Sequence, residues 1–271
     1  MARSDIGNAL QQAAFALNGQ RAAEAERIVA EVLKIDSRNV HALHMFGCAL
    51  LMQGRAAEAI GPLEIAARIR HDPEIDMQLA AALRQTGRVD DALSQLRRAI
   101  KRQPPHPRAF HELGCALAAT KRYDEAAEIF SRGRDIAPMV AEFSVQLGRV
   151  FLKRREFVKA RESFARALEI SPAAHDALSG TALAHQGAGE YDRAAEYFRR
   201  CLATKPDPGT WLNLGRCLLR LGQLDEGYEC FRFAVRADPQ RYGHALATLT
   251  KSARGRFWLK PSAAAQFFQG K

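Results

Sequence analysis

The segment that decides the fold is WLNLG, residues 211–215, together with Gly227, Phe231, Ala234 and Pro239 that follow it. It sets Gly215 among large apolar residues, and further small residues come 12 and 19 positions later. Two helices approach closely only where the side chains at their contact are short, and bulky neighbours then fill the flanking grooves. The segment therefore predicts two packed helices. Proline cannot continue a helix, so Pro239 marks where the second one ends.

The same spacing recurs along the whole chain. Three columns of mostly small residues repeat at intervals of 34, 33, 34, 34, 34 and 33 positions. They are Ala13, Gly47, Ala80, Gly114, Gly148, Ala182 and Gly215; Ala25, Ala59, Ala92, Ala126, Ala160, Ala194 and Gly227; and Val32, Ala66, Ala99, Gly133, Ala167, Cys201 and Ala234. A bulky apolar column accompanies them: Val29, Leu63, Leu96, Phe130, Phe164, Phe198 and Phe231. Since the three columns share even the two shorter intervals, the chain is a tandem repeat.

These residues resemble the consensus of the tetratricopeptide repeat family, and the resemblance covers about nine-tenths of the chain. It implies an all-α, right-handed superhelical solenoid of about seven antiparallel helix pairs with a capping helix at its C-terminal end. The implied units are 6–39, 40–72, 73–106, 107–140, 141–174, 175–207 and 208–241, with 242–271 as capping helix and basic-aromatic tail. Thr181 and His185 occupy core columns of the sixth unit, which predicts looser packing there.

The repeat architecture favours binding over catalysis. Each unit contacts only its neighbours, so an array presents a long open surface, whereas catalysis needs a closed pocket that excludes water. The sequence contains no phosphate-binding loop, no GxSxG elbow, no HExxH and no GxGxxG motif. We therefore predict a non-enzymatic scaffold that binds another protein or peptide, with no cofactor.

Composition predicts a cytoplasmic protein. The start of the sequence leads directly into an amphipathic pattern, without the apolar region of a secretory signal, and no apolar run reaches membrane-spanning length. The five cysteines form no obvious disulfide framework, which favours a reducing compartment.

Candidate binding residues follow from the family's geometry, in which the first helix of each pair lines the groove. The residue two before the small Gly or Ala is often a carboxamide, and a carboxamide can both donate to and accept from a peptide backbone. Arginines on the same face would clamp carboxylates of an acidic partner. The predicted peptide-binding residues are Gln11, Gln78, Glu112, Gln146, Asn213, Arg149, Arg216 and Arg220. The alternative is that these are simply solvated polar residues.

Two pairs spaced four residues apart, His44 with Cys48 and His111 with Cys115, combine metal-ligating side chains on one helical face. Each pair supplies only two ligands, and the pairs lie two repeats apart. We therefore predict no metal site, and interpret these residues as lining the groove or as partly buried.

The tail is basic and aromatic. Residues 208–271 hold 10 Lys and Arg against 4 Asp and Glu, which gives +6 of the chain's +10. Its apolar anchors, predicted to dock, are Phe257, Trp258, Phe267 and Phe268. The tail could fold back as a cap, dock to a partner or to the array's own groove, or engage nucleic acid or an anionic membrane. Nucleic acid and an anionic membrane are the least favoured of these partners, because the stretch is short and most of the array is charge-balanced.

A further alternative concerns the whole chain. Bacterial arrays that resemble this one are often fused to sulfotransferase or glycosyltransferase domains. The chain would then be a regulatory or substrate-recruiting component of an enzyme system.

Overall fold

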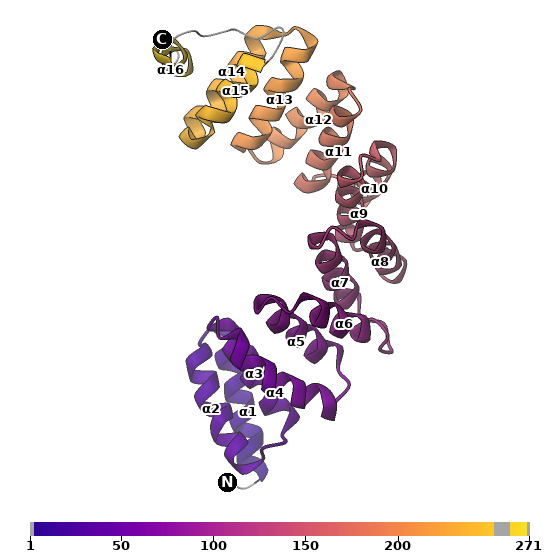
Figure 1. Cartoon of the computed structure of the whole chain (residues 1–271), viewed down its shortest axis with the longest axis vertical. Coiled ribbons are helices and arrows are strands. Elements are labelled where there is room, and N and C mark those ends of the chain that lie inside the picture. Colours follow the sequence, from indigo (N-terminus) through magenta and orange to yellow (C-terminus); the bar gives the residue numbers. More distant parts are fainter. Residues whose placement is uncertain (1–2, 252–260, 270–271) are drawn as a thin grey trace. The chain divides into compact units, whose positions relative to one another are not determined.

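The structure, a computed structural model, describes residues 3–251 and 261–269 (Figure 1). Within these ranges every element of regular secondary structure is a helix and no strand occurs, which confirms the all-α prediction. The helices are α1 (Arg3–Asn18), α2 (Ala22–Ile35), α3 (Val40–Met52), α4 (Ala56–Ile69), α5 (Pro73–Gln85), α6 (Val89–Ala99), α7 (Pro107–Ala119), α8 (Tyr123–Ile136), α9 (Ala141–Lys153), α10 (Phe157–Ile170), α11 (His175–Gly187), α12 (Tyr191–Thr204), α13 (Pro208–Leu221), α14 (Leu224–Ala237), α15 (Tyr242–Lys251) and α16 (Pro261–Gln269), with a 3₁₀ turn at Pro239–Arg241.

The chain forms two compact units, Met1–Ile136 and Ala137–Lys271. In the first unit, α1 to α8 form four helix pairs, and the first helices of neighbouring pairs also contact one another, α1 with α3, α3 with α5 and α5 with α7. The second unit contains the pairs α9–α10, α11–α12 and α13–α14, followed by α15 and α16, and here α9 contacts α11. First helices therefore share one side of the packed pairs.

Local sequence explains where the helices begin and end. Asn39, Asp72 and Asp207 each precede a first helix, and their side chains accept hydrogen bonds from backbone N–H groups of the first turn. Gly222 ends α13 with φ of 81°, a left-handed conformation that glycine adopts without strain. It lets the chain reverse into α14.

The columns of small residues allow neighbouring helices to pack closely, as the sequence predicts. The surroundings of Phe164 on α10 show why. A Cβ atom added at Gly148 of α9 would lie 2.6 Å from Phe164 Cε1, and one at Gly180 of α11 only 2.3 Å from Phe164 Cζ. The phenyl ring is therefore held between two glycines and is 0% exposed. Any side chain at either glycine would have to displace the ring.

Thr181 and His185 place polar groups in the core of α11, where they are 5% and 7% exposed. Thr181 Oγ1 donates to the carbonyl of Ala177 at 2.8 Å. His185 Nδ1 lies 2.8 Å from Glu190 Oε2, and Arg161 Nη1 lies 2.6 Å from Glu190 Oε1. Hydrogen bonds thus compensate for the burial of these groups.

Beside these residues lies a cavity of about 390 Å³ between α10, α11 and α12. An equivalent cavity between α6, α7 and α8 of the first unit measures about 230 Å³ and is lined by Leu113 and Leu117. These two leucines occupy the repeat positions of Thr181 and His185. The larger volume is consistent with the smaller and polar side chains at these positions.

We expect the double replacement Thr181→Leu/His185→Leu to raise the stability of the second unit by about 1 kcal/mol, because leucine fills part of the cavity and Glu190 keeps its ion pair with Arg161. Thermal unfolding followed by circular dichroism measures this. The reciprocal replacement Leu113→Thr/Leu117→His should lower the melting temperature. A lower melting temperature for the leucine variant would contradict the prediction.

Asp76 is a buried carboxylate in α5, 0% exposed, with Arg102 Nη2 at 3.2 Å from its Oδ2. Burial, the largest effect, raises its pKa, against the charges of Arg102 and Arg98. A carboxyl group with a raised pKa binds its proton more tightly in the folded state than in the unfolded one. The Asp76 carboxyl group therefore adds to the stability of the fold below its pKa in the unfolded state. That contribution is lost as pH rises through its pKa in the folded state.

We expect Asp76→Asn to remove this pH dependence. The variant should be more stable than the wild type by about 1 kcal/mol above neutral pH, and the difference should disappear in acid. Urea unfolding across the pH range measures it. Asp135→Asn, at an exposed position of the same unit, is the matched control. A constant difference at all pH values would show that the charge of Asp76 is not its origin.

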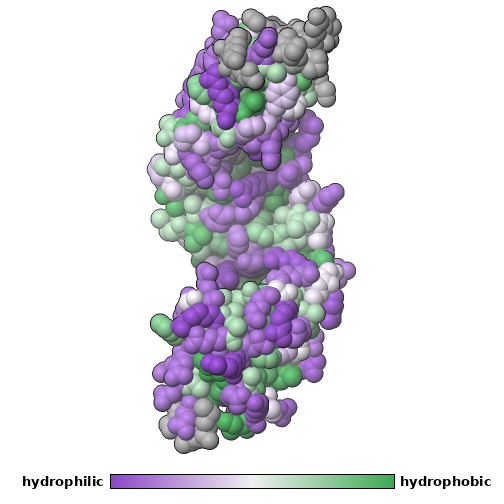
Figure 2. Space-filling view, turned by 90° about the vertical axis from the view of Figure 1, so that its left-hand side faces the viewer, coloured by the Kyte–Doolittle hydropathy of each residue, from purple (hydrophilic) through white to green (hydrophobic). Residues whose placement is uncertain are grey.

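On the face shown in Figure 2, hydrophilic residues cover much of the surface and hydrophobic residues form patches between them. Among the described residues, no helix is both long and apolar enough to cross a membrane.

Candidate functional site

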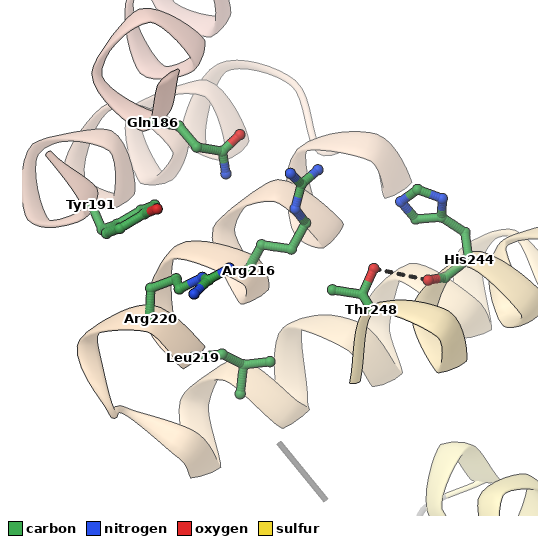
Figure 3. Close-up of a pocket in the computed structure, with 7 residues that line it drawn as sticks. All are labelled: Gln186, Tyr191, Arg216, Leu219, Arg220, His244 and Thr248. Carbon is green, nitrogen blue, oxygen red and sulfur yellow. Dashed lines mark hydrogen bonds between the residues drawn. The ribbon is translucent and has the colours of Figure 1, made fainter. Parts of the chain in front are cut away.

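A half-open cavity of about 390 Å³ lies in the second unit (Figure 3). Four helices contribute to it, α11, α12, α13 and α15. Its lining residues are Gln186, Tyr191, Arg216, Leu219, Arg220, His244 and Thr248. Two first helices of neighbouring pairs, α11 and α13, thus take part in its wall, together with the helix that follows the last pair.

Two guanidinium groups give the cavity its charge. Arg216 and Arg220 are one helical turn apart on α13, and Figure 3 shows Arg216 reaching into the space between Gln186 and His244. Arg216 Nη1 donates to Asn213 Oδ1 at 3.3 Å. Among the described residues that line the cavity, none carries a carboxylate. Guanidinium groups in a concave site attract anions, so the cavity is suited to an anionic group.

Hydrogen bonds fix several of the surrounding side chains. Gln186 Nε2 donates to Cys217 Sγ at 3.2 Å and to the Asn213 carbonyl at 3.4 Å. Thr248 Oγ1 donates to the His244 carbonyl at 2.9 Å, as the dashed line in Figure 3 indicates. These hydrogen bonds hold part of the cavity wall in place.

The predicted residues of α13 come together at this site, while Arg149 and Gln146 of α9 are engaged elsewhere. Arg149 Nη2 pairs with Asp176 Oδ2 of α11 at 2.9 Å. Gln146 Nε2 donates to Glu142 Oε1, one turn earlier, at 2.6 Å. Position 180 in the same column is glycine and carries no side chain at all. The carboxamide column of this unit is therefore discontinuous.

In the first unit, Glu74 of α5 is the centre of the polar contacts on the first helices. Its Oε1 accepts from Gln78 Nε2 at 3.2 Å and from Arg108 Nη1 at 3.0 Å. Gln11 on α1 is exposed and Glu112 on α7 is half-buried. These predicted residues lie on first helices, but the described contacts do not join them into one pocket.

Five residues of the cavity were not predicted from the sequence: Gln186, Tyr191, Leu219, His244 and Thr248. Gln186 and Tyr191 lie outside the columns that the family's geometry assigns to the groove. His244 and Thr248 belong to α15, which follows the last repeat, so no column could place them. The signal that could have found them is the polar face of α15, with His244 and Thr248 four residues apart.

Among the described residues, no group of three or more potential metal ligands occurs, at the His and Cys pairs of the first unit or elsewhere. Burial, with a contribution from Glu74, raises the pKa of Cys48 to about 11. Burial lowers the pKa of His44, in spite of the opposing effect of Glu74.

The aromatic end of the tail is buried. Phe267 and Phe268 of α16 are 5% and 3% exposed, and Phe267 packs edge-on against Tyr228 of α14. Arg232 of α14 donates to the Phe267 carbonyl at 2.9 Å and lies 4.4 Å from the centre of its ring. The other two predicted docking residues, Phe257 and Trp258, lie outside the described residues.

Comparisons with known proteins agree on one family. The tetratricopeptide repeat model matches residues 77–139, 132–175 and 145–208. The model of the middle TPR-like domain of cilia and flagella-associated protein 70 matches residues 181–257. No curated protein is significantly similar to the chain in sequence.

Several solved structures share the fold. A tetratricopeptide repeat protein from Parabacteroides merdae superposes with a TM-score of 0.65 at 14% identity, covering 98% of each chain. The C-terminal part of a TPR repeat-containing protein from Cytophaga hutchinsonii gives 0.67 at 14% identity, with 95% of this chain and 98% of that one covered. YrrB, described as a TPR protein with an unusual peptide-binding site, gives 0.56 at 14% identity, over 67% and 94% of the two chains.

Proposed function

Because the chain belongs to the tetratricopeptide repeat family, we propose that it is a non-enzymatic scaffold that binds an acidic polypeptide segment on its first helices. The observation that carries this proposal is the cavity in the second unit, which brings Arg216 and Arg220 of α13 together with His244 of α15. A binding role also accords with the peptide-binding site that the description of YrrB mentions. The five free cysteines support a reducing, cytoplasmic location.

The basic tail is the weaker candidate for binding. Its described aromatic residues, Phe267 and Phe268, are buried against α14 and therefore cover the chain's own core. The first helices, by contrast, present Asn213, Arg216 and Arg220 on accessible positions. We therefore place the binding site on the first helices.

Selection from a random peptide library, followed by fluorescence anisotropy of the selected peptides, tests the proposal. We expect enrichment of peptides rich in Asp and Glu. The triple variant Gln78→Ala/Gln146→Ala/Asn213→Ala should bind them about tenfold more weakly, because each carboxamide supplies roughly one hydrogen bond. Comparison with Gln78→Ala and Asn213→Ala alone assigns the loss to one unit or the other.

Gln95→Ala is the matched control, because Gln95 lies on the second helix α6. Its affinity should equal that of the wild type. Enrichment of neutral or basic peptides would contradict an acidic partner. Unchanged affinity in the triple variant would exclude the carboxamides from the binding surface.

A further inference from the structure

The cavity between α10, α11 and α12, called here the α10–α12 cavity, differs in chemistry from its equivalent in the first unit. Its walls come from the second helices α10 and α12, and its floor comes from α11. Each of its residues corresponds to one two repeats earlier, in the cavity of α6, α7 and α8. Three apolar residues of that first-unit cavity are replaced by polar ones here: Leu113, Leu117 and Ile129 by Thr181, His185 and Tyr197.

The α10–α12 cavity is also open at a place where the first-unit cavity is crossed by an ion pair. Arg97 of α6 and Glu125 of α8 both line the first-unit cavity, and Arg97 Nη2 lies 2.9 Å from Glu125 Oε2. The equivalent positions hold Ala165 and Arg193, which cannot form such a pair. The polar floor of the α10–α12 cavity is therefore accessible to a ligand from the side of the second helices.

His185 supplies a hydrogen-bond acceptor to this floor. Its Nδ1 lies 2.8 Å from Glu190 Oε2, and hydrogen bonds from Arg161 and His185 lower the pKa of Glu190. An ionised carboxylate only accepts, so Nδ1 carries the proton and Nε2 of the neutral ring has a lone pair. The contact of Nδ1 with Arg161 Nη1 is longer, at 3.3 Å. Within the described part of the chain, Nε2 has no hydrogen-bond partner, although His185 is only 7% exposed.

Thr181 supplies a second acceptor. Its hydroxyl hydrogen is used in the bond to the Ala177 carbonyl, so Oγ1 can only accept a further hydrogen bond. The side chain is 5% exposed and lines the same cavity one helical turn before His185. The floor thus offers two buried, uncharged acceptors on neighbouring turns of α11. Buried acceptors that lack a donor cost free energy, and a ligand with suitable donors would remove that cost.

A primary carboxamide matches this floor. Its NH₂ group carries two hydrogens in one plane, one for each acceptor, whereas a hydroxyl group carries only one. An ammonium group would give up its hydration for two uncharged acceptors, which is unfavourable. The amide oxygen in turn accepts from a donor such as Arg200, whose guanidinium group lies 5.0 Å from the centre of the Tyr197 ring. We propose that the α10–α12 cavity binds a primary carboxamide, as glutamine and asparagine carry.

The rest of the cavity suits the carbon chain of such a ligand. Leu168, Ala165 and the ring of Tyr197 provide apolar wall, and Tyr197 stacks on His185 with ring centres 5.5 Å apart, which holds the imidazole in place. A volume of about 390 Å³ is within the range of small-ligand pockets. The polar floor costs stability relative to leucine, as residues that serve binding commonly do. This site lies apart from the proposed acidic-peptide site and goes beyond that function.

Four probes test the inference: glutamine, glutamate, lysine and N-acetylglutamine amide. Each is titrated into the full chain and followed by calorimetry and by NMR of the histidine ring nitrogens. Glutamate has the shape of glutamine without its amide hydrogens, so we expect it to bind about tenfold more weakly. Bound glutamine should shift the Nε2 signal of His185 as an accepted hydrogen bond does.

The blocked amide identifies the source of the carboxamide. Equal affinity for glutamine and N-acetylglutamine amide would assign the site to a side chain of a polypeptide. Weaker binding of the blocked amide would assign it to the free amino acid, whose ammonium and carboxylate groups can meet Glu169 and Arg200 at the exposed edge of the cavity.

Variants locate the binding. Thr181→Leu/His185→Leu should abolish it, and because this variant is expected to be more stable than the wild type, unfolding cannot explain the loss. Ala165→Arg/Arg193→Glu introduces the ion pair of the first-unit cavity and should reduce the affinity while the floor is unchanged. His71→Leu/Thr86→Leu makes the same two chemical changes at exposed positions of the first unit and should bind normally.

Several results would overturn the inference and leave the acidic-peptide proposal intact. Glutamate or lysine that binds as tightly as glutamine would show that the amide hydrogens are not recognised. Glutamine binding that survives Thr181→Leu/His185→Leu would place the site elsewhere. A wild-type chain that binds neither glutamine nor the blocked amide would show that the floor takes no carboxamide.

Discussion

Replacing Phe164 by alanine is expected to lower the free energy of unfolding of the second unit by about 3–5 kcal/mol. The ring is 0% exposed, and its neighbours on α9 and α11 are Gly148 and Gly180. Neither glycine has a side chain that could move into the space left by the ring. The cavity therefore stays open, and the cost should fall in the upper part of the range.

Urea unfolding followed by circular dichroism measures the loss. Phe15→Ala is the matched control, because that phenyl ring is 73% exposed and its removal should change stability by less than about 0.5 kcal/mol. Gly180→Ala provides a second test. It should destabilise the wild type, where its methyl group meets the ring, and stabilise Phe164→Ala, where the same methyl group fills part of the cavity. An equal effect in both backgrounds would contradict the packing described here.

The second large loss of stability is expected from the double replacement Phe267→Ala/Phe268→Ala. Both rings are buried against α14 and α15, where Phe268 packs edge-on against Tyr242. Each truncation alone would cost about 3–5 kcal/mol if α16 stayed in place. The helix can instead detach, so the total loss cannot exceed the free energy with which α16 is docked. We expect a loss of about 3 kcal/mol in the second unit and none in the first.

Detachment of α16 would expose Tyr228, Tyr242 and Leu249, so the double variant should bind a hydrophobic dye that the wild type does not. Hydrogen exchange should show faster exchange in α14 and α15. Arg232→Met, which removes the hydrogen bond to Phe267 and keeps an apolar stem, should show a smaller change of the same kind. A double variant with wild-type stability and no dye binding would show that α16 contributes nothing to the core.

The sequence was sufficient to predict the helix pairs, because close packing restricts residue size directly. Gly148 and Gly180 had to be small for the ring of Phe164 to fit, and a size restriction repeated every 33 or 34 residues is visible without a structure. The turns between paired helices were harder to predict from the sequence. Gln20, Lys121 and Arg155 occupy turn positions with φ of 56°, 61° and 61°, where the equivalent residues of the other four pairs are glycine. A propensity argument cannot identify a turn in which the usual residue is absent.

The candidate site was predicted only in part. The columns predicted Asn213, Arg216 and Arg220 as binding residues, and on α13 Asn213 is half-buried and both arginines are exposed. They could not show that Arg149 pairs with Asp176, because an ion pair depends on the positions of two helices and not on the period of one. They also could not include His244, which belongs to a helix outside the repeat. A pocket formed by several elements requires the packing of those elements to be known.

The fit of Gly180 against Phe164 also bears on how such an array can change its length during evolution. Residues 175–207 correspond to one repeat, so a gene could lose them without disturbing the period. Asn213 would then take the place of Gly180, since both stand two positions before the small residue of their first helix. Its side chain would need the space of the ring, which lies 2.3 Å from where a Cβ at Gly180 would be. The duplicated units have thus become specific for their neighbours, and loss of one would require a compensating change in the next.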